Sequence, residues 1–141
     1  VIYGEGTLRK KLQNKIDEIG LQKIIFLPGK EEKLLEIIND SAMFVLSSDY
    51  EGLPNVLIEA MCMGMPVIAT DCPSGGPREL INNNINGILV PVNNKKKLVE
   101  AMIRLTDNDL AKKMGDNAYE KQDVFEKWEN FLFKKKDTLN E

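Results

Sequence analysis

The sequence predicts a doubly wound α/β fold, in which helices cover both faces of a parallel β-sheet. Strand-like and helix-like patterns alternate about four times along the chain, and the connections between them are short. The run "AMFVLSS" has apolar residues on both faces of a strand, which is typical of parallel sheets covered on two sides. The chain has 141 residues and a hydrophobic content of 43%, which is enough for one domain with a buried core.

Five short apolar runs are expected to be strands, because each ends at a turn residue or at polar sequence. They are residues 1–3 ("VIY"), 23–29 ("KIIFLPG"), 42–48 ("AMFVLSS"), 65–70 ("MPVIAT") and 86–92 ("NGILVPV"). In such sheets ligands bind beyond the carboxyl ends of the strands. The loops that follow these runs should therefore face one crevice.

Helices are expected between these runs, where apolar residues recur at steps of three and four. They cover residues 7–19, 31–40 and 54–64, the end of "DCPSGGPREL", and the chain from residue 96 onward, with breaks near residues 106–109 and 123 and a last helix over residues 123–137. The first of them should end at Gly20. The third should have Pro54 as its first residue and end at Gly64.

Composition and charge exclude several functional classes. The net charge is −3, so there is no global positive field to attract nucleic acid or an anionic membrane. No apolar run approaches the ~20 residues of a membrane span and no signal peptide is recognisable, so we expect a cytoplasmic protein. The chain has no histidine, which excludes Ser-His-Asp and Cys-His catalysis and histidine-bound zinc. Cys62 and Cys72 fit no metal spacing and are expected to be reduced thiols in or near the core.

The strongest functional signal is "DYEGLPNVLIEAMCMGMP", residues 49–66. At the start of the predicted helix, the N–H groups of Asn55, Val56 and Leu57 lack partners within the helix, and together with the helix dipole they form an anion site. Glu59 leans back toward this site and would accept hydrogen bonds from neighbouring hydroxyls, such as those of a ribose. Glu51 stands in the loop, where a sugar on a diphosphate would lie. These residues describe a clamp for a nucleotide sugar.

The alternative is that Glu59 is a helix residue at the solvent edge, favoured by the dipole, and that Glu51 is an ordinary loop charge. Burying an unpaired carboxylate costs several kcal/mol unless it gains hydrogen-bond donors. The apolar neighbours of Glu59 therefore tip the balance toward a functional role.

The segment "SSDYEGLPNVLIEAMCMGMPVIATDCPSGGPREL" resembles the signature of glycosyltransferase family 4, retaining enzymes of the GT-B fold. The hallmark of that family is a Glu, seven residues and a second Glu, matched here by Glu51 and Glu59. The pieces "YGEGTLR" and "FLPG" also match, so the resemblance covers at least residues 1–105. It implies a Rossmann-like three-layer parallel sheet flanked by helices. Residues 1–141 would be a single, incomplete C-terminal donor-binding domain.

The resemblance also implies roles for individual residues. Glu51 would be the catalytic residue that contacts the hydroxyls of the transferred sugar, and Glu59 would contact the ribose. The backbone around the start of the helix would hold the sugar and diphosphate, at Gly52, Leu53, Pro54, Asn55 and Val56. Gly29 and Lys30 would lie beside the base. The remaining donor-binding candidates are Gly75 and Gly76, where a loop closes on the nucleotide, and Gly4 and Gly6. For the last four glycines, a purely structural role in turns remains an alternative.

Family members carry an Arg and a Lys that neutralise the diphosphate, on a segment that would precede Val1, and a second, N-terminal domain that binds the acceptor. Because the chain starts without Met inside an apolar run, we expect a fragment that grips part of a donor and is inactive alone. The intact enzyme would transfer a hexosyl unit from a nucleoside diphosphate sugar to an acceptor hydroxyl with retention of configuration. The style of the "SGGPREL" loop favours UDP as the nucleotide.

The same resemblance implies no metal and no other cofactor, since basic side chains and a helix N-terminus neutralise the leaving diphosphate. The expected partners are a nucleotide-sugar donor and a sugar or lipid-linked acceptor, in the synthesis of bacterial surface glycan, lipopolysaccharide or capsule. The full-length protein is also a candidate for peripheral association with the inner face of the plasma membrane.

Two other functions remain open. A nucleotide-sugar-binding module without transfer activity would keep the same fold and loop. A dinucleotide-dependent oxidoreductase is disfavoured, because Arg9 stands where G-x-G-x-x-G requires its third glycine and no acidic residue ends the next strand.

Overall fold

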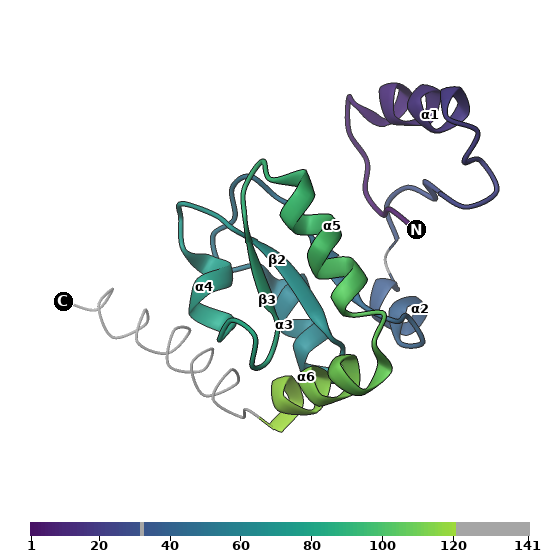
Figure 1. Ribbon diagram of the computed structural model, residues 1–141. Coiled ribbons are helices and arrows are strands. Elements are labelled where there is room, and N and C mark those ends of the chain that lie inside the picture. Colours follow the sequence, from purple (N-terminus) through teal and green to yellow (C-terminus); the bar gives the residue numbers. More distant parts are fainter. Residues whose placement is uncertain (32, 121–141) are drawn as a thin grey trace. The chain divides into compact units, whose positions relative to one another are not determined.

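The computed structural model describes residues 1–31 and 33–120 (Figure 1). The helix expected over residues 123–137 lies outside the described residues. The elements in chain order are α1 (Arg9–Glu18), α2 (Leu34–Ile38), β1 (Phe44–Leu46), α3 (Asn55–Cys62), β2 (Val67–Asp71), α4 (Gly76–Leu80), β3 (Ile88–Pro91), α5 (Lys95–Arg104) and α6 (Asn108–Glu120). The chain forms two compact units, Val1–Ile38 and Asn39–Glu141.

The second unit contains a parallel sheet in the order β1-β2-β3. Phe44 pairs with Val67 at one end of the β1–β2 ladder, and Asp71 pairs with Pro91 at one end of the β2–β3 ladder. The central strand β2 is buried from Val67 to Thr70. This confirms the parallel α/β fold and three of the predicted strands.

Helices cover both faces of this sheet, as Figure 1 shows for α3 behind it and α5 in front. The core beside α5 and α6 consists of Ile68, Ile88, Val90, Ala101, Leu105 and Met114. On α3 the buried residues are Leu57, Ile58, Ala60 and Met61. The apolar residues of β2 therefore have partners on both sides, which explains why that strand lacks a polar face.

Two glycines allow α3 and α6 to approach closely. Gly64 follows α3 with φ +71°, the left-handed conformation expected of a helix-ending glycine. A Cβ atom added to Gly115 of α6 would overlap the Gly64 carbonyl group, so the helix backbone passes directly over this turn. The prediction that the helix ends at Gly64 is thereby confirmed.

In the first unit, the predicted strands 1–3 and 23–29 are wrong as regular strands. The structure has a single parallel bridge between Tyr3 and Gly29, supported by a hydrogen bond from Ile2 N to Phe26 O of 2.9 Å. Ile2, Ile24 and Phe26 are all exposed by half or more. Apolar sequence predicts a strand only where other elements cover it, and no covering layer forms within the described residues of this unit.

The remaining helices agree with the sequence within a few residues. Gly20 ends α1 with φ +71°, as predicted, and α2 is shorter than the expected span of 31–40. The predicted break near residues 106–109 separates α5 from α6, where the Asp107 side chain accepts hydrogen bonds from the N–H groups of Asp109 and Leu110. None of the described helices has the length and apolar character needed to cross a membrane.

Candidate functional site

The start of α3 differs from the prediction by one position. Pro54 is the N-cap of the helix, not its first residue, because its ψ of 104° is extended. Its carbonyl oxygen accepts hydrogen bonds from Leu57 N at 3.0 Å and Ile58 N at 3.3 Å. No side chain of the described residues caps the helix. The prediction of a free N–H group at Leu57 is wrong, because that group is bonded to Pro54. In the same part of the chain, the N–H groups of Asn55 and Val56 have no hydrogen-bond partner, so two donors remain available there.

Glu59 lies on the exposed face of α3, together with Asn55 and Val56. These residues are spaced three and four apart, so their side chains share one side of the helix. Glu59 is therefore not a carboxylate within a buried helix, contrary to the prediction, because the buried residues of α3 lie on its other face. Its position one turn from the free N–H groups agrees equally with solvation and with a ligand at the helix start.

Glu51 lies between β1 and α3, and two serines hold it. The Ser48 hydroxyl donates a hydrogen bond to Glu51 Oε1 at 2.7 Å. The Ser74 hydroxyl donates to the Glu51 carbonyl oxygen, so the loop after β2 holds the Glu51 backbone. Neither serine contact was predicted from the sequence, where "SSDYEG" indicated only small polar residues beside the backbone.

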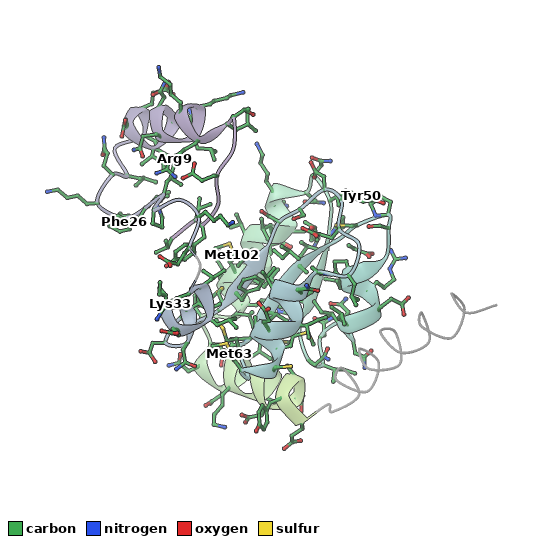
Figure 2. The ribbon with its side chains drawn as sticks, turned by 180° about the vertical axis from the view of Figure 1, so that it is seen from behind. Arg9, Phe26, Lys33, Tyr50, Met63 and Met102 are labelled. Carbon is green, nitrogen blue, oxygen red and sulfur yellow. The ribbon has the colours of Figure 1, made fainter. Side chains whose placement is uncertain are left out.

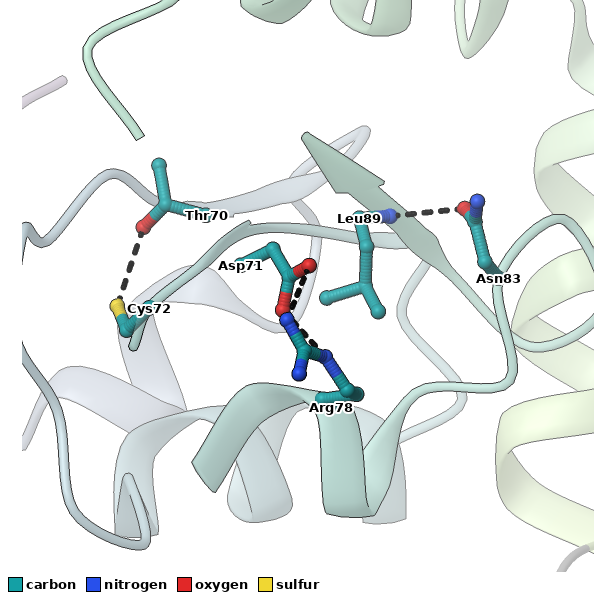
Figure 3. A network of polar contacts seen from close by, with 6 residues as sticks. All are labelled: Thr70, Asp71, Cys72, Arg78, Asn83 and Leu89. Carbon is teal, nitrogen blue, oxygen red and sulfur yellow. Dashed lines mark hydrogen bonds and ion pairs between the residues drawn. The ribbon is translucent and has the colours of Figure 1, made fainter. Parts of the chain in front are cut away.

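The buried end of β2 fixes the loop that carries Ser48. Thr70 Oγ1 donates to the Ser48 carbonyl oxygen and lies 3.3 Å from that of Leu46. Cys72 Sγ lies 3.1 Å from the same Ser48 oxygen and 3.7 Å from Thr70 Oγ1 (Figure 3). Thr70 and Cys72 are both buried, so this contact between the two strand ends is shielded from water.

The loop between β2 and α4 packs closely on the Glu51 loop. Gly75 has φ +85°, and a Cβ atom at Gly76 would overlap the carbonyl group of Gly52. The structure therefore explains why glycine occupies both positions. Their contact with a nucleotide stays a prediction. Figure 3 also shows the ion pair that joins Arg78 of α4 to Asp71.

Apart from Gly75 and Gly76, the predicted residues of the second unit fall on one continuous segment, from Glu51 to Glu59. Gly52 is exposed, Leu53 is half-buried and Pro54 is buried. Figure 2 shows Tyr50 on this loop and Met63 at the far end of α3. Tyr50, the residue before Glu51, is 76% exposed, so most of it is open to solvent.

In the first unit, the bridge at Tyr3 brings Gly4 next to Gly29. Gly4 N donates to Gly29 O at 2.8 Å, Gly29 is buried with φ +100°, and Lys30 is exposed. Gly6 lies in the turn before α1, where an added Cβ would meet no atom within 4 Å. Residues of the "GEG" turn and the start of α1 line a cavity of about 350 Å³ within this unit.

Arg9 braces that turn, because its guanidinium donates to Leu27 O and lies 3.4 Å from Glu5 Oε1. Where the oxidoreductase motif would need a glycine, this chain therefore has an arginine with a structural role.

The Cys62 thiol, which lies on α3 near Glu59, has a raised pKa. Partial burial, followed by the negative charge of Glu59, raises the pKa of the Cys62 thiol above its ordinary value of 9.0. The thiol therefore stays protonated near neutral pH. Cys72 is buried and both cysteines are free, as predicted.

The fold and the site together define a class of protein. A parallel sheet, with loops at the carboxyl ends of its strands and a helix that starts beside one of those loops, is typical of α/β domains that bind ligands at that edge of the sheet. The model of the family described as glycosyl transferases group 1 matches residues 1–121, and the chain belongs to this family.

Two relatives illustrate the similarity. The chain is 33% identical over 139 residues to the poly(ribitol-phosphate) alpha-N-acetylglucosaminyltransferase of Staphylococcus aureus, covering 93% of this chain and 28% of that protein. It is 31% identical over 122 residues to the UDP-Gal:alpha-D-GlcNAc-diphosphoundecaprenol alpha-1,3-galactosyltransferase of Escherichia coli, covering 86% of this chain and 31% of that protein. Both of these bacterial relatives are glycosyltransferases, one for poly(ribitol-phosphate) and the other for alpha-D-GlcNAc-diphosphoundecaprenol.

Among solved structures, the chain is similar to a point mutant of S. aureus TarM in complex with fondaparinux, alpha-GlcNAc-glycerol and UDP. The TM-score is 0.79 at 33% identity, over 92% of this chain and 28% of that chain. The α/β fold is therefore that of the GT-B glycosyltransferases. The chain spans about a third of the length of the two relatives.

Proposed function

We propose that this chain is the C-terminal donor-binding domain of a retaining glycosyltransferase of family 4, which uses a UDP-sugar. The uncapped start of α3 carries the proposal, because Asn55 and Val56 offer unpaired N–H groups between the carboxylates of Glu51 and Glu59 in sequence. Oxygens of a diphosphate would accept from these donors, with the helix dipole adding to the attraction. The UDP bound in the similar TarM structure and the UDP-Gal in the name of the E. coli relative favour this donor.

The two carboxylates then have separate tasks. Glu59 accepts hydrogen bonds from the two ribose hydroxyls, while Glu51 accepts from hydroxyls of the sugar being transferred. We assign Gly29 and Lys30 to the base, and Gly4, Gly6, Gly75 and Gly76 to loops that approach the nucleotide.

In the reaction, the bond between the anomeric carbon and the diphosphate oxygen breaks while a bond to the acceptor oxygen forms on the same face. The acceptor proton passes to the leaving phosphate, so the products are a glycoside and UDP. Backbone donors and basic side chains neutralise the leaving group, and no metal takes part in the proposed scheme.

The active enzyme contains more than this sequence. The chain covers about a third of its relatives, so we assign acceptor binding, with a sugar or lipid-linked acceptor, to an N-terminal domain of the full-length protein. That protein would act in the cytoplasm or on the inner face of the plasma membrane, in surface-glycan synthesis. The 141 residues alone should bind part of the donor without transferring sugar.

A binding experiment tests the proposal on the 141-residue chain. UDP, GDP and NAD are compared by saturation-transfer NMR and titration calorimetry, and we expect UDP to bind best. Glu59→Ala should weaken UDP binding roughly tenfold or more, because a carboxylate that accepts from hydroxyls contributes about 1.5–3 kcal/mol. Glu100→Ala is the matched control and should bind like wild type, because Glu100 is a half-buried glutamate of α5 that pairs with Lys97.

Glu51→Ala should leave UDP binding almost unchanged and should abolish most sugar transfer by the full-length protein. Preferred binding of NAD, or wild-type behaviour of both glutamate variants, would contradict the proposal.

A further inference from the structure

We propose that Ser48 is a positioning residue, which holds the carboxylate of Glu51 in the orientation that receives the transferred sugar. This inference rests on the role proposed for Glu51. It concerns a residue of the loop after β1 that does not itself touch the substrate in the proposed scheme.

The first observation is the hydrogen bond from Ser48 Oγ to Glu51 Oε1, at 2.7 Å. A hydroxyl that donates to a carboxylate forms a strong, directional bond. It occupies one carboxylate oxygen and leaves Oε2 for a ligand. A glutamate in a loop has three side-chain torsions, and this bond restricts them before a substrate arrives.

The second observation is that Ser48 is itself held from the core. Its carbonyl oxygen accepts from Thr70 Oγ1 and Cys72 Sγ, and those two residues are 5% and 0% exposed. Thr70 belongs to β2, the most buried of the described strands, and Cys72 directly follows that strand. The position of the Ser48 hydroxyl is therefore set by the sheet, because the backbone that carries it cannot shift without breaking buried contacts.

The third observation is that Ser74 hydrogen-bonds to the main chain of Glu51, independently of Ser48. Ser74 donates its hydroxyl to Glu51 O, and Glu51 N lies 3.4 Å from the same Ser74 oxygen. The backbone of Glu51 is thus fixed by the loop after β2, while Ser48 is the described residue that hydrogen-bonds to its carboxylate. Removing the Ser48 hydroxyl should free the carboxylate without moving the backbone.

The test is steady-state hydrolysis of UDP-sugars by the full-length protein that contains this sequence, measured as UDP release. UDP-glucose, UDP-galactose, UDP-N-acetylglucosamine and UDP-N-acetylgalactosamine are compared first, and the fastest substrate is used for the variants. Ser48→Ala should lower kcat roughly tenfold with little change in KM, because a carboxylate displaced by about 1 Å loses its alignment in the transition state.

Four variants separate positioning from folding. Ser48→Thr keeps the hydroxyl and should restore most of the kcat lost in Ser48→Ala. Ser47→Ala removes the neighbouring exposed hydroxyl, for which no hydrogen bond is found in the described chain, and should behave like wild type. In a Glu51→Gln background, Ser48→Ala should cause no further loss, because the group it positions is already altered. Ser48→Cys, nearly equal in volume, covers the case in which the alanine variant fails to fold, and it should also lower kcat.

The outcomes distinguish the two proposals. If the wild type hydrolyses none of the four UDP-sugars, or if Glu51→Gln is as active as wild type, the proposed function is wrong and the positioning role with it. If Glu51→Gln is impaired while Ser48→Ala and Ser48→Cys keep wild-type kcat, only the positioning role is wrong. An equal loss in Ser48→Thr and Ser48→Ala would also overturn it.

Discussion

Arg78 and Asp71 form a bidentate ion pair that joins α4 to the end of β2. Arg78 Nε donates to Asp71 Oδ1 at 2.8 Å and Arg78 Nη2 to Asp71 Oδ2 at 2.7 Å. The hydrogen bond and then the charge of Asp71 raise the pKa of Arg78 further above its already high value. Arg78 is therefore already paired within the fold, and a substrate phosphate would have to compete with Asp71 for it.

Asp71→Asn should slightly lower the thermal unfolding midpoint in low salt, because it removes one charge of an exposed ion pair. The difference from wild type should shrink between about 0.02 M and ~1 M NaCl, since the screening length falls to about 3 Å at ~1 M. Asp40→Asn, at another exposed position, is the control. A difference that stays constant with salt would show that the charge attraction is not the cause.

Gly76→Ala should destabilise the chain and also weaken UDP binding. The new methyl group would push against the Gly52 carbonyl group, next to the proposed ligand amides. Overpacking of this kind costs about 1–3 kcal/mol, which urea unfolding measures. Gly115→Ala is the matched control, because its methyl group would push against the Gly64 carbonyl at the other end of α3. It should lose similar stability and keep UDP affinity at temperatures where it is folded. Equal weakening of UDP binding in both variants would contradict the local explanation.

Cys62 should react slowly with iodoacetamide near neutral pH, because burial and Glu59 raise the pKa of its thiol above 9.0. Glu59→Gln removes the smaller of the two causes and should speed the reaction. The raised pKa also affects folding, since the native thiol holds its proton where the unfolded thiol loses it. The resulting stabilisation is complete below the ordinary pKa and is lost as the pH rises through the native pKa.

This contribution is measured by unfolding in urea between about pH 7 and about pH 10.5, with Cys62→Ser as the reference. Wild type should lose more stability than Cys62→Ser above the ordinary thiol pKa of 9.0. A parallel decline of the two proteins would contradict the effect.

The parts of the fold that the sequence predicted well are those that local pattern determines. Strands β2 and β3 and the helices after them follow from apolar spacing, and Gly20 and Gly64 mark helix ends because few other residues adopt their φ. Residues 1–3 and 23–29 have equally apolar sequence but lack cover among the described residues of their unit, which is a tertiary property. The loss of those two strands was therefore not predictable from the sequence.

The candidate site was predictable to the level of its segment and not of its contacts. The spacing of Glu51 and Glu59 indicates a site at α3 and the loop before it. The contacts of Ser48 and Ser74 with Glu51 depend on how two loops fold against each other, as does the overlap at Gly76. The one-residue error at the start of α3 arose because proline is common at the first helical position, while only ψ distinguishes that position from the cap.

The proline at the N-cap of α3 implies a compromise between the stability of the fold and the binding of a ligand. A Ser, Thr, Asp or Asn at position 54 would supply a side-chain oxygen to accept from the free N–H groups. Such a capping side chain stabilises a helix by about 0.5–2 kcal/mol. Pro54→Asp should consequently raise the melting temperature relative to Pro54→Ala, while its carboxylate would occupy the amides that we assign to UDP and repel the diphosphate. A more robust protein with poorer affinity for UDP would mean that the bare helix start is retained for its ligand at the expense of thermal resistance.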